Sequence, residues 1–289
     1  MQLNKTPKLS ISAWVWTSTP EENNFDFINK AASIGYQGVE IPTFTGDINK
    51  KSLRETISSV SKKMYPIIVG GGSRQMDLTS NNLQNRKNAY RYIEKLIELC
   101  EFVDSELICG PLYAPVGKLK LISDHLRNKI LDRVASSFKT LSNKLEDSGI
   151  KIALEPLCRY DTYLINTVDQ AIELISRINS DNFGILIDTF HTNIEEESIS
   201  KAFEISGKKT YHIQVCENNR GIPGSGQINW KEVKKSLKLL NYDKWISVES
   251  FTPYDDKFSE KMRMWRKFSP DQDFFAKESY SFLKHLLSE

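Results

Sequence analysis

Residues 151–156 read Lys-Ile-Ala-Leu-Glu-Pro and residues 183–191 read Phe-Gly-Ile-Leu-Ile-Asp-Thr-Phe-His, so two short apolar runs each stop at an acid. Between them, residues 168–179 place apolar side chains on one stripe of a helix. A strand, a helix and a strand in this order form the crossover that joins parallel strands. Because active sites of parallel barrels form at the carboxyl ends of the strands, Glu155 and Asp188 are predicted to face one shared pocket.

Two further strand-like runs repeat the pattern downstream. Residues 211–217 and 245–251 are apolar segments that carry Gln214 and Glu249 near their ends. Four oxygen-bearing side chains therefore lie at the ends of four successive predicted strands: Glu155, Asp188, Gln214 and Glu249. Oxygen ligands converging in this way predict a divalent-metal site.

The rest of the chain continues the alternation of strands and helices. Further strands are predicted at residues 9–16, 37–41, 65–69 and 106–109, and further helices at 21–34, 49–62, 81–102, 123–147, 198–206, 230–240 and 273–287. Eight strands alternating with eight helices, with no linker between them, predict an α/β fold made of a single (β/α)8 TIM barrel over residues 1–289. The glycines at 70–72 lack the spacing of a dinucleotide-binding fingerprint.

Composition excludes several classes of function. A net charge of +2 argues against a dedicated nucleic-acid binder, which usually carries a basic excess. The four cysteines are scattered, which is typical of reduced thiols in a cytoplasmic protein; Cys109 and Cys158 are predicted to be packing residues. Residues 1–5 lack an apolar signal region, and no apolar run approaches the ~20 residues that span a bilayer. We therefore expect a soluble cytoplasmic protein with no nucleic-acid or membrane partner.

Two segments carry a family resemblance. Residues 188–196 read Asp-Thr-Phe-His-Thr-Asn-Ile-Glu-Glu, and residues 217–226 read Glu-Asn-Asn-Arg-Gly-Ile-Pro-Gly-Ser-Gly. With weaker likeness at 110–113 and 264–266, the chain resembles the ketose 3-epimerases of the D-tagatose and D-psicose type. These enzymes belong to the xylose-isomerase-like barrels of the sugar isomerase and epimerase superfamily.

The resemblance implies a role for each matching position. It places the metal ligands at Glu155, Asp188, Gln214 and Glu249. It places the substrate-binding residues at Asp161, His191 and Arg220. The chain departs from the family in having Gln214 where a histidine is usual, although hydroxypyruvate isomerases have glutamine there, and in having Asp161 where glutamate is usual.

The implied reaction is epimerisation at carbon 3 of a ketohexose or ketopentose, of the D-tagatose, D-psicose or ribulose type. No lysine- or arginine-rich phosphate site stands out in residues 114–120 and 253–267, which favours an unphosphorylated substrate. A proton leaves carbon 3 to give an enediolate and returns on the opposite face. Glu155 and Glu249 are assigned as the acid and base. His191 and Arg220 are expected to donate hydrogen bonds to the oxygens at carbons 1 and 2, and Asp161 to accept one from a hydroxyl.

Several side chains near the predicted strand ends have two interpretations. Trp14, Trp16, Tyr113 and Phe251 either fill the core or line the apolar face of the sugar, and Tyr113 and Phe251 are predicted to contact the substrate. His212 is interpreted as a hydrogen-bonded core residue, with the alternative that it replaces Gln214 as the ligand. The acids at residues 195–197 are predicted to be a solvated helix start.

The ligand set also predicts the metal. Three carboxylates and an amide oxygen make an all-oxygen site, which suits Mn²⁺, with Mg²⁺ or Co²⁺ as alternatives. The expected partner is a small sugar, and the chain is expected to form a homo-oligomer, either a dimer or a tetramer.

Three rival functions stay open. Gln214 is also compatible with a related isomerase or dehydratase of the same barrel group, of the hydroxypyruvate isomerase or inosose dehydratase type. A DNA-repair endonuclease on this fold uses a histidine-rich three-zinc cluster, for which the four histidines here lack the pattern. A non-catalytic sugar sensor is disfavoured because both Glu155 and Glu249 are retained.

Overall fold

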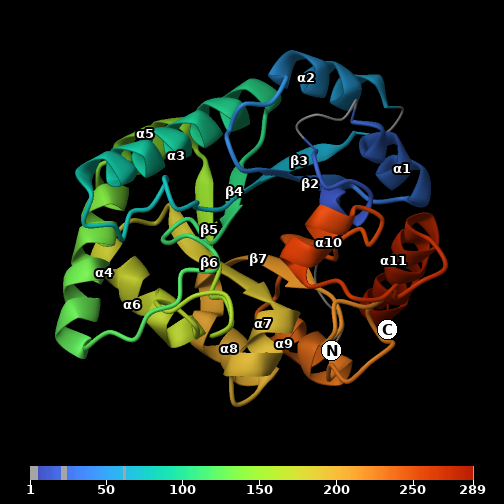
Figure 1. Cartoon of the computed structure of the whole chain (residues 1–289). Helices are drawn as coiled ribbons and strands as arrows, with labels where there is room; N and C mark the ends of the chain where they lie inside the picture. Colours follow the sequence, from blue (N-terminus) through green and yellow to red (C-terminus); the bar gives the residue numbers. More distant parts are fainter. Residues whose placement is uncertain (1–5, 21–24, 61–62, 289) are drawn as a thin grey trace.

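The computed structural model describes residues 6–20, 25–60 and 63–288, and the strands within these ranges form one closed parallel barrel (Figure 1). The strands follow the chain order around the barrel: β1 Lys8–Ser12, β2 Gly38–Thr43, β3 Tyr65–Gly70, β4 Leu107–Gly110, β5 Lys151–Leu154, β6 Phe183–Asp188, β7 Thr210–Val215 and β8 Trp245–Val248. Pairing of Ile11 in β1 with Val248 in β8 closes the ring. The predicted (β/α)8 fold class is confirmed.

The helices surround the barrel, as the ribbon in Figure 1 shows. They are α1 Asp26–Ile34, α2 Lys50–Ser59, α3 Leu83–Val103, α4 Asp124–Lys139, α5 Ser142–Ser148, α6 Val168–Ile178, α7 Thr189–Glu195, α8 Ile199–Ser206, α9 Trp230–Leu239, α10 Asp256–Met262 and α11 Gln272–Ser288. Helix α6 shows why these segments fold locally. The Thr167 side chain accepts from the backbone N–H of Gln170 at its start, and Asn179 ends it in a left-handed conformation.

Several predicted boundaries are wrong. The first strand ends at Ser12, because the Ser12 hydroxyl caps a 3-10 helix at Ala13–Val15. The predicted helix at 123–147 is broken into α4 and α5, and helices α7 and α10 were not predicted. The predicted helices at 21–34 and 49–62 extend into residues outside the described ranges.

The acids at residues 195–197 do not form a helix start. Glu195 is the last residue of α7, and its carboxylate accepts from the backbone N–H of Arg159 at 2.7 Å and from the guanidinium Nη2 at 2.9 Å. The prediction of a solvated helix start is therefore wrong for Glu195, because a partner from the loop after β5 folds over it.

The interior of the barrel changes from apolar to polar along the strands. Leu186 packs with Ile67, Val69 and Cys109 in a small buried cluster. Asp188 stands two residues after Leu186 on β6, so it shares the same inward face one level closer to the carboxyl end. The apolar layer thus forms a floor beneath the acids at the strand ends.

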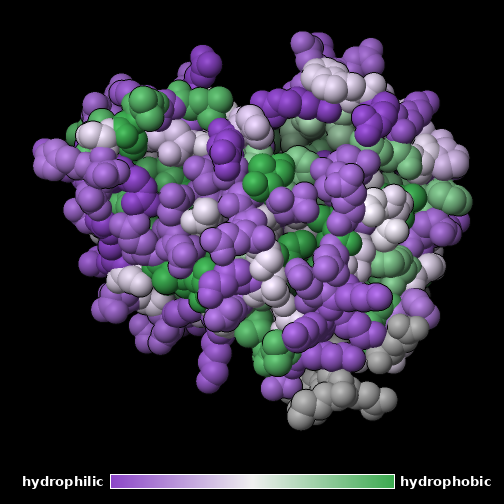
Figure 2. All heavy atoms as spheres, turned by 90° about the horizontal axis from the view of Figure 1, so that it is seen from below, coloured by the Kyte–Doolittle hydropathy of each residue, from purple (hydrophilic) through white to green (hydrophobic). Residues whose placement is uncertain are grey.

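The outer surface is mainly hydrophilic. On the face shown in Figure 2, hydrophobic residues occur in scattered groups rather than in one continuous band. Among the described residues, no helix combines the length and the apolar character that crossing a membrane requires.

Candidate active site

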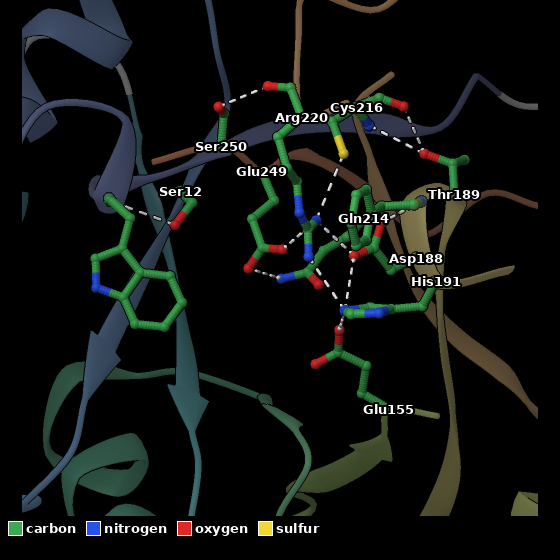
Figure 3. Close-up of polar contacts among 12 residues, drawn as sticks. Ser12, Glu155, Asp188, Thr189, His191, Gln214, Cys216, Arg220, Glu249 and Ser250 are labelled. Atoms are coloured by element: carbon green, nitrogen blue, oxygen red, sulfur yellow. Dashed lines mark hydrogen bonds and ion pairs between the residues drawn. The ribbon is translucent and has the colours of Figure 1, made fainter. Parts of the chain in front are cut away.

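Four acceptor-bearing side chains meet where β5, β6, β7 and β8 end. Asp188 is the last residue of β6, Glu155 and Glu249 follow β5 and β8 directly, and Gln214 is the penultimate residue of β7. Asp188 and Gln214 are register partners on neighbouring strands. All four side chains are buried, and Figure 3 shows them pointing toward a common centre. The sequence pattern therefore located these residues correctly at one end of the barrel.

Burial and mutual repulsion destabilise the ionised forms of these acids. Burial raises the pKa of Glu155 well above its usual range, and the neighbouring carboxylates of Glu249 and Asp188 raise it further. Burial also raises the pKa of Glu249 to about 8, against the lowering effect of Arg220. A group of buried acids of this kind is a favourable place for additional positive charge.

Arg220 supplies one such charge. Its Nη1 donates to Asp188 Oδ2 at 2.7 Å and to Glu249 Oε2 at 2.9 Å (Figure 3). The guanidinium carbon lies 4.1 Å from the ring centroid of Phe190 and 5.1 Å from that of Phe251. Two acids and two aromatic faces therefore hold a buried cation at the centre of the site.

The backbone at Arg220 is strained and firmly held. Its φ is +66°, in the left-handed region that few side chains adopt. The Arg220 N–H donates to the carbonyl oxygen of Glu217 at 2.9 Å, and the Ser250 hydroxyl donates to the carbonyl oxygen of Arg220 at 2.8 Å. The buried Glu217 carboxylate accepts from the backbone N–H of Gly224 and from the indole N–H of Trp230, both at 2.7 Å. The loop after β7 therefore fixes the guanidinium in place.

His191 presents a hydrogen-bond donor to the site. The backbone N–H of Cys158 donates to its Nδ1 at 3.0 Å, so Nδ1 carries the lone pair and the ring proton sits on Nε2. Burial lowers the pKa of His191 to about 4, which keeps the ring neutral near pH 7. Nε2 lies 3.6 Å from both Glu155 Oε1 and Asp188 Oδ2. A protonated Nε2 offers no lone pair to a metal, so this geometry favours a donor role.

Gln214 exposes its amide oxygen rather than its nitrogen. Its Nε2 donates to Glu40 Oε1 and Oε2 at 3.1 and 3.0 Å and to Glu249 Oε1 at 3.2 Å. Its buried Oε1 has no hydrogen-bond partner among the described residues. An unpartnered buried carbonyl oxygen beside three carboxylates is a donor set that suits a divalent cation.

Glu40 is the residue of the site that the sequence analysis missed. It lies in the middle of β2 and is fully buried, and its Oε1 is 2.6 Å from His212 Nε2. The signal was a single acid inside the otherwise uncharged strand of residues 38–43. The interpretation of His212 as a hydrogen-bonded core residue is confirmed by this contact.

The remaining predicted substrate residues divide into two kinds. Asp161, in the loop after β5, pairs with Arg263 at 3.0 Å. Tyr113 is fully buried, and its hydroxyl donates to the backbone oxygens of Glu155 and Ile165 at 2.9 and 3.1 Å. Tyr113 therefore supports the backbone of an active-site acid, whereas Asp161 stays at the edge of the site.

The aromatic residues do not form a single group. Trp14 and Phe251 pack with Phe258 from α10, with ring centroids 5.5–6.0 Å apart. Trp16 instead donates from its indole nitrogen to Asp273 at 2.7 Å. The apolar wall beside the site is thus built by the ends of β1 and β8 and by α10.

Comparisons with known proteins agree with this geometry. A probable ketose 3-epimerase from Synechocystis sp. is 28% identical over 96% of this chain and 96% of its own length. A D-psicose 3-epimerase from Ruminiclostridium cellulolyticum is 29% identical over 89% of this chain and 88% of its own. The structure of a D-psicose 3-epimerase from Clostridium cellulolyticum with D-tagatose superposes with a TM-score of 0.87 at 26% identity, covering 97% of this chain and 99% of that one.

The family assignment rests on a broader match. The model of the xylose isomerase-like TIM barrel family matches residues 28–268, which include every acid of the site described above. The relatives named above are epimerases, a class of isomerase. This chain therefore belongs to the xylose isomerase-like TIM barrel family.

Proposed function

We propose that this protein is a metal-dependent ketose 3-epimerase that acts on an unphosphorylated ketohexose or ketopentose. The observation that carries the proposal is the pair of buried acids, Glu155 and Glu249, at one centre with two hydrogen-bond donors, His191 and Arg220. The epimerase relatives support it, since they cover most of this chain.

The donor set fits a divalent cation. The cation would be held by the unpartnered Oε1 of Gln214 and by the carboxylates of Glu155, Asp188 and Glu249. An all-oxygen set suits Mn²⁺, with Mg²⁺ and Co²⁺ as weaker substitutes. When bound, the cation supplies Lewis acidity to the substrate carbonyl and orients the carbonyl and the adjacent hydroxyl.

Proton transfer is assigned to Glu155 and Glu249. One carboxylate takes the proton from carbon 3, the C–H electron pair forms the carbon 2–carbon 3 double bond, and the carbonyl π pair moves to the oxygen at carbon 2. The other, protonated, acid returns a proton to carbon 3 on the opposite face, and the carbonyl re-forms. Reversing the two roles gives the reverse reaction.

His191 and Arg220 stabilise the charge that grows on the enediolate. The Nε2–H of His191 and the guanidinium of Arg220 lie on the same side of the acids, 3.1 Å apart. With its proton on Nε2, His191 is a donor like Arg220, so an anionic oxygen within reach of both atoms gains two hydrogen bonds and relieves the contact between the two donors. Asp161 would accept from a hydroxyl farther along the sugar.

The loops near the site favour an unphosphorylated substrate. In the loop after β4, Lys118 Nζ pairs with Asp77 at 2.6 Å. Near the end of α10, Arg263 pairs with Asp161. Lys118 and Arg263 each have an acidic partner, so either would have to give up an ion pair to bind a phosphate group.

The proposal is tested with a panel of substrates. Purified protein loaded with Mn²⁺ is incubated with fructose, psicose, tagatose and ribulose, and in parallel with small oxo-acids and an inosose. Conversion of a ketose into its carbon 3 epimer is expected. Turnover of the oxo-acids or the inosose alone would instead assign the chain to the isomerase or dehydratase type that Gln214 also fits.

A further inference from the structure

The amide of Gln214 has two chemically different ends, and its surroundings select between them. Three acid oxygens lie within 3.2 Å of the amide nitrogen, two from Glu40 and one from Glu249. Carboxylate oxygens accept hydrogen bonds and an amide oxygen cannot donate. The reversed amide would therefore bring oxygen against oxygen three times.

Glu40 is itself held in place for this task. It reaches Gln214 from β2, which is not a neighbour of β7 in the barrel, so the contact crosses the barrel interior. The same carboxylate meets His212 Nε2 at 2.6 Å. Glu40 and His212 are both fully buried. Two donors from β7, His212 and Gln214, therefore hold the buried carboxylate of Glu40 in one position.

The orientation decides what Gln214 can do chemically. An amide nitrogen has its lone pair delocalised into the carbonyl and does not bind metals, whereas the amide oxygen is a hard ligand. In the observed orientation the oxygen is buried and has no partner in the described part of the chain. It is the free end of the side chain, opposite the end that Glu40 holds.

We infer that Glu40 is a positioning residue that turns the Gln214 amide so that its oxygen, not its nitrogen, is offered to the metal. The inference rests on the metal centre of the proposed function. It also explains how this position can hold either glutamine or histidine: an imidazole can donate one N–H to Glu40 and offer its other nitrogen to the ion. Glu40 thus sets the affinity of the site without touching the ion.

The substitution Glu40→Gln tests the inference with almost no change in shape. His212 would hold the new amide by its oxygen, so the new amide nitrogen faces Gln214, and Gln214 must reverse to accept from it. The hydrogen bond between positions 40 and 214 is preserved, the one from Gln214 to Glu249 is lost, and the amide nitrogen of Gln214 points to the metal. We expect Mn²⁺ affinity, measured by calorimetry, to fall about 10–100-fold. The melting temperature in excess chelator should stay close to that of the parent protein.

A double-mutant cycle separates positioning from a direct effect of the Glu40 charge. In a Gln214→Ala background there is no amide to orient, so Glu40→Gln should change Mn²⁺ affinity by less than about 3-fold. In the swapped variant Glu40→Gln with Gln214→Glu, the new amide at position 40 donates to one oxygen of the new carboxylate at position 214. The other oxygen then faces the metal, so this variant should recover most of the lost affinity. If Glu40→Gln binds Mn²⁺ as tightly as the parent, or costs the same in both backgrounds, the inference is wrong.

Two further controls separate failure of the inference from failure of the metal centre and from misfolding. If the parent protein itself does not bind Mn²⁺, the proposed metal centre fails, which is a different result from failure of the inference. If Glu40→Gln does not fold, Glu40→Asp replaces it in the same cycle, because it keeps the charge and withdraws the carboxylate by one methylene. Loss of affinity confined to the Gln214 background is again expected, and equal losses in both backgrounds overturn the role assigned to Glu40.

Discussion

At the scale of single residues, the site depends on which atom each side chain presents. His191 presents a proton because a backbone N–H occupies its other nitrogen, and Gln214 presents an oxygen because acids surround its nitrogen. Neither feature is visible in a list of residue types. Both follow from contacts between segments that are far apart in the chain.

The first prediction concerns Gln214→His. The imidazole can keep one hydrogen bond to Glu40 and offer a softer nitrogen ligand, so metal preference should move from Mn²⁺ toward Co²⁺ or Zn²⁺. Competitive metal titration of the variant and the parent measures this shift. The matched comparison is His212→Ala with Gln214→Ala: loss of metal only in the His212 variant would transfer the ligand role to His212.

The second prediction concerns the donors. His191→Ala should lower kcat/KM by a factor corresponding to about 2–4 kcal/mol, because it removes a hydrogen bond to the developing enediolate charge. Arg220→Asn should do likewise, and asparagine is chosen because it tolerates the left-handed backbone at that position. Metal content, measured by elemental analysis, should not change in either variant. Loss of metal would contradict the assignment of these residues to the substrate.

At the scale of elements, the strands were predictable and the segments between them less so. Short apolar runs ending at Asp188 and beside Glu155 marked β6 and β5 well, because strands buried on both faces are continuously apolar. The break between α4 and α5 and the short helix α10 were not predictable. Their ends depend on packing against other segments, such as the contact of Phe258 with Trp14.

The third prediction concerns Gly110, which ends β4. Its φ is +117°, and an added Cβ would lie 2.2 Å from the carbonyl oxygen of Gly70 on the neighbouring strand. Gly110→Ala should therefore destabilise the protein by about 3 kcal/mol or more in chemical unfolding. Gly117→Ala is the control, since Gly117 also has a positive φ but nothing lies within 4 Å of its added Cβ. It should cost only about 1 kcal/mol; equal losses would mean that the close approach of β3 and β4 is not what matters.

At the scale of the whole molecule, the barrel gathers four acids and one amide into a buried cluster, from β2 and from the ends of β5, β6, β7 and β8. The sequence pointed to the last four of these strands because each has its acid or amide at or near its end. It did not point to Glu40, since a lone acid in mid-strand acquires a role only when the barrel closes and brings β2 opposite β7. The pairing of Arg220 with Asp188 and Glu249 was likewise a product of closure.

The fourth prediction concerns the stability of the whole protein. A cation bound among buried acids stabilises the native state by mass action, by about 2.7 kcal/mol at a concentration of 100 times Kd. Adding Mn²⁺ to chelator-treated protein should therefore raise Tm by about 3–8 °C. Calorimetry with and without Mn²⁺ measures the change, and Gln214→Ala should show a smaller rise. Identical melting curves in Mn²⁺ and in chelator would argue against a metal centre.

The most direct test of the central claim follows the proton at carbon 3. With the ketose that the substrate panel identifies, in deuterated water and with Mn²⁺, the parent protein should place deuterium at carbon 3 of the product, detected by NMR. Glu155→Gln and Glu249→Gln should each slow this exchange by about 100-fold or more, as expected when a general acid or base is lost. Epimerisation without deuterium at carbon 3, or full activity in either variant, would contradict a mechanism in which Glu155 and Glu249 exchange the proton of that carbon.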